Sequence, residues 1–221
     1  MSEHLTQIAH AVEQFLTSLP PEVTIEVACK GRTAEEVEAA YQAGIRHFAH
    51  NYVQEAQAML PALSFEADWH MIGHLQRNKA PKAIKLFNMI ESVDSLRLAE
   101  ELDQRCAQAS KMMPILLEIN SGREANKTGI LPEDLDALVE GLFNLSHLHL
   151  EGLMTMGPRY GNPEESRSYF VETRKLFERL KGKNLPHATM RWLSMGMSNS
   201  YLVAIEEGAN LIRIGTAIFG K

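Results

Sequence analysis

The sequence contains little cysteine and no long apolar run, and both absences restrict the classes of protein to which it can belong. Its 221 residues include two cysteines, Cys29 and Cys106. Two are too few for a disulfide framework, and they fit a reducing compartment. No apolar run approaches the roughly 18 residues that cross a membrane, and the opening MSEHLTQIAHAVEQF lacks the apolar block of a signal peptide. We therefore expect a cytoplasmic protein without a membrane partner.

An excess of positive charge is also missing. The chain has 22 Lys and Arg residues against 28 Asp and Glu, which gives a net charge of −6. A surface of that sign does not favour nucleic acid, so we expect no such partner. With 45% hydrophobic and 23% charged residues, the composition is globular and excludes a disordered tail, a collagen or a coiled coil. The length suits one domain, residues 1–221, of the size of a β/α barrel.

Short apolar runs alternate with helical stretches along the chain. The alternation predicts parallel βαβ units, and eight strands each followed by a helix is the count of a closed (β/α)8 (TIM) barrel, with an extra N-terminal helix capping its bottom. A doubly wound open sheet is the alternative, although the GxGxxG nucleotide motif is absent. The expected strands are 24–29, 46–49, 69–72, 88–92, 114–120, 148–154, 190–194 and 210–214, and the clearest helices are 3–18, 33–43, 95–110, 132–143, 164–181 and 198–207.

In a barrel, chemistry takes place where the strands end. Lys30 follows the first strand and by strand parity shares a face with Glu26 and Ala28. Burial at the mouth of a barrel favours a free amine, which a Schiff base with an aldehyde requires; a lysine that reaches solvent is the alternative. The residues at the eight expected strand ends are Lys30, Asn51, His74, Ser92, Asn120, Thr155, Ser194 and Arg213.

The segments after the last two strands are rich in glycine and hydroxyl side chains. Ser194 to Ser200 reads SMGMSNS, and Arg213 is followed by Ile214, Gly215 and Thr216. Small residues that lead into helices expose backbone N–H groups to an anion, and the seventh and eighth loops are the recurrent phosphate site of this fold. Together they predict a phosphate-bearing ligand.

Two other patterns carry less weight. His47 with His50, and His70 with His74, have spacings found in metal sites, but no HExxH or CxxC motif accompanies them. We therefore expect no metal. Residues 122–128, GREANKT, lack the glycine that precedes the lysine of a phosphate-binding P-loop, and a plain loop is expected there.

Nearly the whole chain resembles the pyridoxal phosphate homeostasis proteins. The resemblance lies in a set of motifs that occur in one order, and their number makes it specific. They are Cys29-Lys30, FAHNYVQEA (48–56), WHMIGHLQRNK (69–79), ESVDS (91–95), ILLEINSGREANKTG (115–129), GLMTM (152–156), LSMGMSNS (193–200) and IRIGTAIFG (212–220).

The resemblance implies a single TIM barrel like the barrel domain of alanine racemase, a fold-type III enzyme. It implies pyridoxal 5′-phosphate (PLP) bound to Lys30 as an internal aldimine, with Arg213 near the pyridine nitrogen and Asn51 close to the cofactor. The phosphate is expected at Ser194, Met195, Ser198, Gly215 and Thr216.

The same resemblance implies a role in vitamin B6 and amino-acid homeostasis. Family members are usually monomers with no established reaction, so no catalytic residue is assigned. PLP-dependent apoenzymes are the expected protein partners.

The chain departs from the family pattern in two places. The family often has a second lysine just after the PLP lysine, and here Lys30 is followed by Gly31 and Arg32. The family's FGENYVQE reads FAHNYVQE, with Ala49 and His50 at the second and third positions.

A fold-type III racemase is the main alternative function. Racemisation needs an acid–base group on each face of the substrate carbon, and the family of racemases takes the second group, a tyrosine, from another domain. Tyr52 is the one tyrosine near an expected strand end. A Schiff-base aldolase is less favoured, since such aldolases usually carry their lysine on a later strand.

Overall fold

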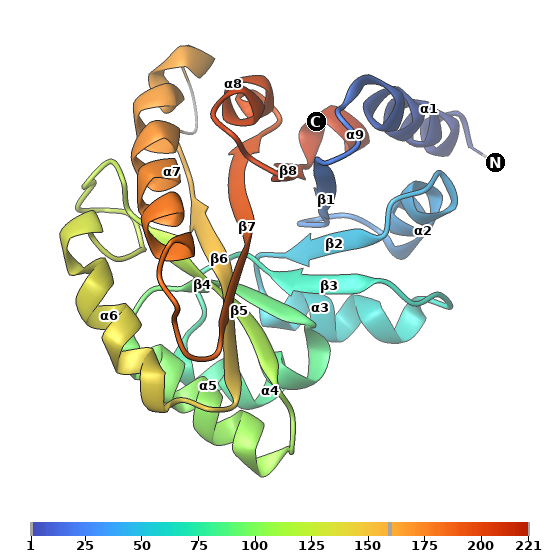
Figure 1. Cartoon of the computed structure of the whole chain (residues 1–221). Coiled ribbons are helices and arrows are strands. Elements are labelled where there is room, and N and C mark those ends of the chain that lie inside the picture. Colours follow the sequence, from blue (N-terminus) through green and yellow to red (C-terminus); the bar gives the residue numbers. More distant parts are fainter. Residues whose placement is uncertain (1, 159–160, 221) are drawn as a thin grey trace.

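The computed structural model describes residues 2–158 and 161–220, and within them eight parallel strands close into one barrel in chain order (Figure 1). The predicted barrel is confirmed, and the alternative of an open doubly wound sheet is wrong because β1 pairs with both β2 and β8. The strands are β1 Thr24–Ala28, β2 His47–His50, β3 Asp68–Met71, β4 Met89–Val93, β5 Met113–Ile119, β6 Leu148–Thr155, β7 Ala188–Met197 and β8 Leu211–Ile214.

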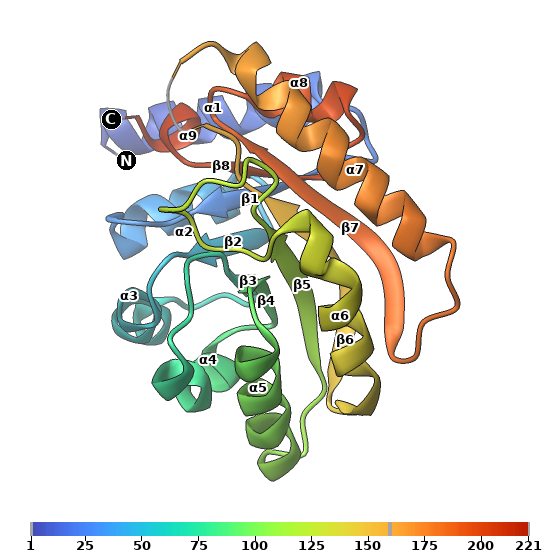
Figure 2. The same cartoon turned by 90° about the vertical axis from the view of Figure 1, so that its left-hand side faces the viewer.

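Helices surround the barrel (Figures 1 and 2), and local capping explains where several of them begin. The Ser2 hydroxyl accepts a bond from the backbone of Leu5 at the start of α1, and Thr33 and Glu36 form a capping box at the start of α2. Among the described residues, no helix combines the length and the apolar character that crossing a bilayer requires. The α-helices are α1 Glu3–Ser18, α2 Ala34–Gln42, α3 Val53–Met59, α4 Ala80–Leu86, α5 Leu96–Gln108, α6 Leu135–Gly141, α7 Arg167–Lys181, α8 Tyr201–Glu206 and α9 Thr216–Phe219; short 3-10 helices are η1 Leu60–Ala62, η2 Arg77–Lys79, η3 Pro132–Asp134, η4 Leu142–Asn144 and η5 Pro163–Ser166.

The sequence predicted that the N-terminal helix caps the bottom of the barrel, and this prediction is wrong. The helix lies in the outer layer of helices, beside α2 and α9 (Figures 1 and 2). Ile8 and Val12 of α1 are buried, and the ring of Phe15 packs edge-on against Tyr201 of α8, with 5.4 Å between the centroids. The short helix α9, Thr216–Phe219, and α2 are therefore neighbours of α1 in this layer.

The barrel interior has two layers of different chemistry. The layer nearer the start of the strands is apolar and consists of Met89, Leu116, Met154, Trp192 and Leu211. Two residues further along their strands, toward the mouth, come Glu91, Glu118, Ser194 and Arg213, all of them buried. A larger apolar core lies between the strands and the helices. Buried ionisable groups therefore lie directly beneath the mouth of the barrel.

Candidate ligand-binding site

Lys30 lies at the mouth of the barrel, two residues after β1. Strand parity predicted that it shares a face with Glu26, and Glu26 is fully buried in the barrel interior. The burial expected for Lys30 is wrong and the alternative of a lysine that reaches solvent holds, because its side chain is exposed. Its Nζ lies 5.5 Å from the centroid of the Tyr52 ring. A reactive aldehyde can therefore reach this amine from solvent.

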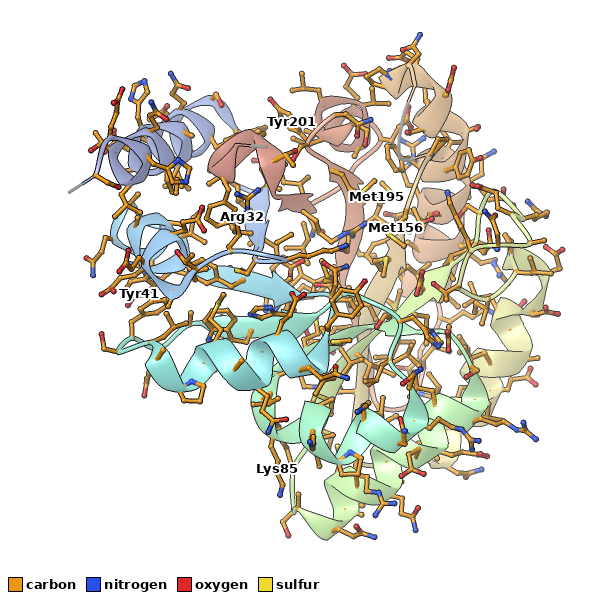
Figure 3. All side chains as sticks on the ribbon, turned by 180° about the vertical axis from the view of Figure 1, so that it is seen from behind. Arg32, Tyr41, Lys85, Met156, Met195 and Tyr201 are labelled. Atoms are coloured by element: carbon orange, nitrogen blue, oxygen red, sulfur yellow. The ribbon has the colours of Figure 1, made fainter. Side chains whose placement is uncertain are left out.

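Arg32, which stands near the position of a second family lysine, anchors the loop that carries Lys30. Its guanidinium donates to the carbonyl oxygens of Gly220, at 2.8 Å, and Phe219, at 3.4 Å, and it packs over the Phe219 ring. Figure 3 shows Arg32 beside α9. Gly31 allows the turn between the two side chains with a φ of +69°. Arg32 thus holds the lysine loop against the element that follows β8.

The segment after β8 presents two backbone N–H groups to one point. The N–H groups of Gly215 and Ala217 both donate to Ser198 Oγ, at 3.2 and 3.3 Å. Gly215 has a φ of −124°, and a Cβ built there would lie 3.6 Å or more from its nearest neighbours, which belong to Ala28. The chain itself therefore does not require glycine at this position. A phosphate between β1 and β8, which the sequence places at this glycine, stays a prediction.

Arg213 lies below these N–H groups, in the barrel interior, with 4% of its surface exposed. One of its nitrogens donates to Ser194 Oγ and the other to the carbonyl oxygen of Thr155, the latter at 2.8 Å. The Ser194 hydroxyl in turn donates to Glu91 Oε2 at 2.6 Å. Two of the three guanidinium nitrogens are thus held by residues of β6 and β7.

The expected end of the seventh strand was wrong by three residues. Ser194 lies inside β7 and its side chain is buried, so it contacts Arg213 from within the barrel, whereas Ser198 lies beyond the strand. Met195 is fully buried in the core between the strands and the helices. A direct contact of either residue with a phosphate stays a prediction, and the structure assigns both to packing or to the support of Arg213.

The other residues at the expected strand ends bind neighbouring loops. Asn51 is half-buried, and its backbone lies so close to Gly73 that a Cβ on Gly73 would come within 2.2 Å of the Asn51 oxygen. Thr216 is exposed at the start of α9. The remaining contacts are Ser92 Oγ to the Gly73 oxygen, His74 Nδ1 with Asp94 Oδ2, Asn120 Nδ2 to the Glu124 oxygen, and Thr155 Oγ1 to the Ile119 oxygen.

The sequence reasoning missed the acidic and basic groups inside the barrel. Glu26, His70, Glu91 and Glu118 are buried in the middle of strands. Strands of a parallel barrel are covered on both sides and are expected to be continuously apolar. An ionisable residue inside each of TIEVA, DWHM, MIESV and MPILLEI was therefore the signal that would have identified them.

His50, a departure from the family pattern, faces away from the barrel interior. Its side chain is fully buried, and its ring stacks on Trp69 with 5.7 Å between the centroids. Neither ring nitrogen has a hydrogen-bond partner in the part of the chain that the structure describes. Burial lowers the pKa of His50 to about 4, so the ring is neutral at pH 7.

We expect His50 to make the fold acid-sensitive. An unfolded histidine binds its proton near pH 6.5 and the folded one only near pH 4, so the stabilising contribution is complete above pH 6.5 and is lost as the pH falls toward 4. The variant His50→Phe should lose about 2 kcal/mol less unfolding free energy than the wild type between pH 6.5 and 4.5. Urea unfolding at each pH measures this. The exposed His10→Gln is the control and should follow the wild type; equal losses in all three proteins would contradict the prediction.

Comparison with known proteins agrees with this geometry. The family model described as "Alanine racemase, N-terminal domain" matches residues 4–221. A pyridoxal phosphate homeostasis protein of Aquifex aeolicus is 38% identical over 198 residues, covering 88% of this chain and 85% of that protein. The protein of the same name from Synechocystis is 37% identical over 209 residues, covering 94% and 95%.

Solved structures give the same result. The chain is similar to PipY of Synechococcus elongatus with PLP bound, with a TM-score of 0.88, 35% identity and coverage of 96% of this chain and all of that one. It is also similar to alanine racemase of Bacillus anthracis, with a TM-score of 0.77, 20% identity and coverage of 98% of this chain and 56% of that one. At that identity the second likeness concerns the fold.

Proposed function

The chain belongs to the family of pyridoxal phosphate homeostasis proteins, and from this membership we propose that it binds PLP at Lys30 and serves in PLP homeostasis. The observation that carries the proposal is the arrangement around β1 and its neighbour β8. An exposed amine, two converging backbone N–H groups and a buried guanidinium come from these two adjacent strands and the segments that follow them.

The residues present fit the chemical groups of PLP. When bound, PLP supplies an aldehyde that combines reversibly with a free amine, and Lys30 Nζ is the amine that would hold it. Ser198 and the N–H groups of Gly215 and Ala217 would hold the phosphate, and these N–H groups would then turn from Ser198 Oγ to the phosphate oxygens. Arrays of backbone N–H groups of this kind bind anions.

Arg213 would determine the behaviour of the ring. An arginine is always charged, and beside the pyridine nitrogen its charge would keep that nitrogen unprotonated, which would weaken the ring as an electron sink. The hydrogen bonds from Arg213 to Ser194 and Thr155 fix the guanidinium before the ligand arrives. Such a site favours holding the cofactor over stabilising a carbanion.

The racemase alternative finds less support at the mouth. Lys30 and Tyr52 are direct neighbours, with the ammonium over the phenol ring, whereas two-base racemisation needs groups on opposite faces of the substrate.

We further propose that the protein acts as a monomer in the cytoplasm and passes PLP to apoenzymes. The two cysteines are buried free thiols, which supports a reducing compartment.

The test is chemical trapping. The purified protein is mixed with PLP, reduced with borohydride, digested and examined by peptide mass spectrometry. We expect one pyridoxyl group on the peptide that contains Lys30, and less of it when inorganic phosphate is present in excess. A pyridoxyl group on another lysine, or none, would show the site assignment to be wrong. Rapid, Lys30-dependent turnover in a chiral assay of amino acids would favour the racemase.

A further inference from the structure

Three ionisable side chains from three strands meet inside the barrel, below the proposed site. Glu26 comes from β1, His70 from β3 and Glu91 from β4, and all three are buried. His70 Nδ1 lies 2.6 Å from Glu26 Oε1 and 2.9 Å from Glu91 Oε1. We call these residues the lumen cluster. The mechanism proposed above uses none of them directly.

The lumen cluster is connected to Arg213 by hydrogen bonds and by strand pairing. Glu91 uses one oxygen for His70 and the other for the Ser194 hydroxyl, and Ser194 accepts a bond from Arg213. Glu26 and Arg213 are also direct partners in the register of β1 and β8. A change of charge at Glu26 therefore acts on the Arg213 guanidinium in two ways, through the hydrogen-bonded chain of His70, Glu91 and Ser194 and directly across the β1–β8 pair.

The short distances indicate a shared proton and not a metal ion. Two ligands of one zinc ion, each bound at about 2.0 to 2.2 Å, are separated by about 3 Å or more, whereas His70 Nδ1 and Glu26 Oε1 are 2.6 Å apart. His70 Nδ1 holds at most one proton and lies within hydrogen-bond distance of both carboxylates, so it can donate to only one of them at a time. Two carboxylates that share one N–H proton repel each other, and this disfavours ionisation of Glu26.

The expected charges follow from this environment. Burial and the charge of Glu91 raise the pKa of Glu26 to about 7, against the opposing effect of His70. Burial would lower the pKa of His70, but the two carboxylates outweigh it and raise that pKa to about 10. Burial would raise the pKa of Glu91, but the hydrogen bond and charge of His70, together with Arg213, hold it below its usual value.

We propose that the lumen cluster is a positioning and charge-setting unit for Arg213, so that a proton on Glu26 strengthens the binding of a phosphate-bearing pyridine ligand at the mouth. The proposal rests on the proposed function, because it concerns the same ligand. Glu26 belongs to β1, the strand that precedes Lys30. The titratable and charged groups that face the lumen from the other strands are His47 of β2, His70 of β3, Glu91 of β4, Glu118 of β5 and Arg213 of β8.

The direction of the effect can be derived from the charges. With Glu26 protonated, His70 and Arg213 are positive and Glu91 is negative, so these four side chains together carry one positive charge. With Glu26 ionised, that charge is lost, and the attraction for a phosphate weakens. By linkage, a bound anion must also raise the proton affinity of Glu26, and binding near pH 7 must take up a proton.

The experiment compares the wild type with Glu26→Gln, which keeps the neutral state at every pH. Pyridoxine 5′-phosphate is the main probe, because it has no aldehyde and removes the pH dependence of Lys30; PLP is measured in parallel. Binding is followed by calorimetry between pH 6 and 8.5 in buffers of different ionisation enthalpy. The pH dependence of the free ligand is common to all proteins. We expect the affinity of the wild type to fall about three- to tenfold more than that of Glu26→Gln over this range.

Two more variants complete the test. Ser194→Ala breaks the link between Glu91 and Arg213, and it should reduce the pH-dependent difference even if Glu26→Gln folds poorly. Glu207→Gln is the matched control, since Glu207 is also a buried glutamate but pairs with Arg167 and Arg174 on the outside of the barrel; it should behave as the wild type.

The outcomes separate this inference from the proposed function. Extra proton uptake by the wild type, absent in Glu26→Gln, would support the inference. Parallel pH profiles and equal proton uptake in the two proteins would overturn it, while trapping of PLP on Lys30 would leave the proposed function intact. If neither vitamer binds the wild type, the proposed function is wrong and the inference falls with it.

Discussion

Replacing Lys30 with alanine is expected to abolish covalent retention of PLP and to lower the affinity for PLP about 100-fold or more. The physical reason is the loss of the amine that the proposed site offers to the aldehyde, since an amine is the group that forms a reversible bond with a carbonyl. The groups proposed to hold the phosphate, Ser198 and the N–H groups of Gly215 and Ala217, remain in place.

The loss of affinity should occur without loss of the fold. Lys30 is exposed, and its ammonium contacts the Tyr52 ring, an interaction worth about 0.5 to 1 kcal/mol at exposed sites. The unfolding free energy should therefore change by about 1 kcal/mol or less. Spectroscopic titration with PLP, borohydride trapping and urea unfolding measure the three quantities.

A second ligand and a second lysine serve as controls. Pyridoxine 5′-phosphate, which has no aldehyde, should bind Lys30→Ala and the wild type with similar affinity. Lys85→Ala removes an exposed lysine of α4 (Figure 3) and should keep the adduct on Lys30. If Lys30→Ala still yields the same amount of reduced adduct, another amine holds the cofactor and the assignment is wrong.

The sequence was informative where a local pattern determines the structure. The alternation of short apolar runs with helices predicted eight parallel strands, because a parallel connection requires a crossover helix, and the strands lie within a few residues of the expected ranges. Lys30, Ser198 and Gly215 lie near the ends of strands, where chain direction alone places the mouth of the barrel.

The features that escaped prediction depend on contacts between distant segments. The helix α1 packs beside α9 from the other end of the described chain, and no local pattern encodes that contact. The strand β7 continues past Ser194 to Met197. The Ser194 hydroxyl bonds to Glu91, about a hundred residues earlier in the chain, and to Arg213 in the following strand. Periodicity reports one segment at a time, so it could not show that these charges meet.

The variant Arg213→Leu is expected to have the other large effect, on stability as well as on binding. It removes a buried cation and leaves Glu91, which is fully buried, with His70 as its one remaining cationic partner. Removing one member of a buried ion pair costs about 3 to 5 kcal/mol. Here Ser194 lies between the two charges and His70 remains. We therefore expect the unfolding free energy measured in urea to fall by about 2 to 3 kcal/mol. The affinity for PLP should fall by at least about tenfold, because one hydrogen bond to a charged group is worth about 1.5 kcal/mol or more.

A double-variant cycle tells an electrostatic cause from a simple loss of packing. Glu91→Gln removes the negative charge that Arg213→Leu leaves uncompensated, so the double variant should be more stable than the sum of the single effects predicts, by about 1 kcal/mol or more. Strict additivity would mean that Arg213 supports the barrel by its volume alone. The binding data give the complementary answer: restoring stability through Glu91→Gln should not restore affinity, because the guanidinium that faces the ligand is still missing. Recovery of both properties together would place the ligand away from Arg213.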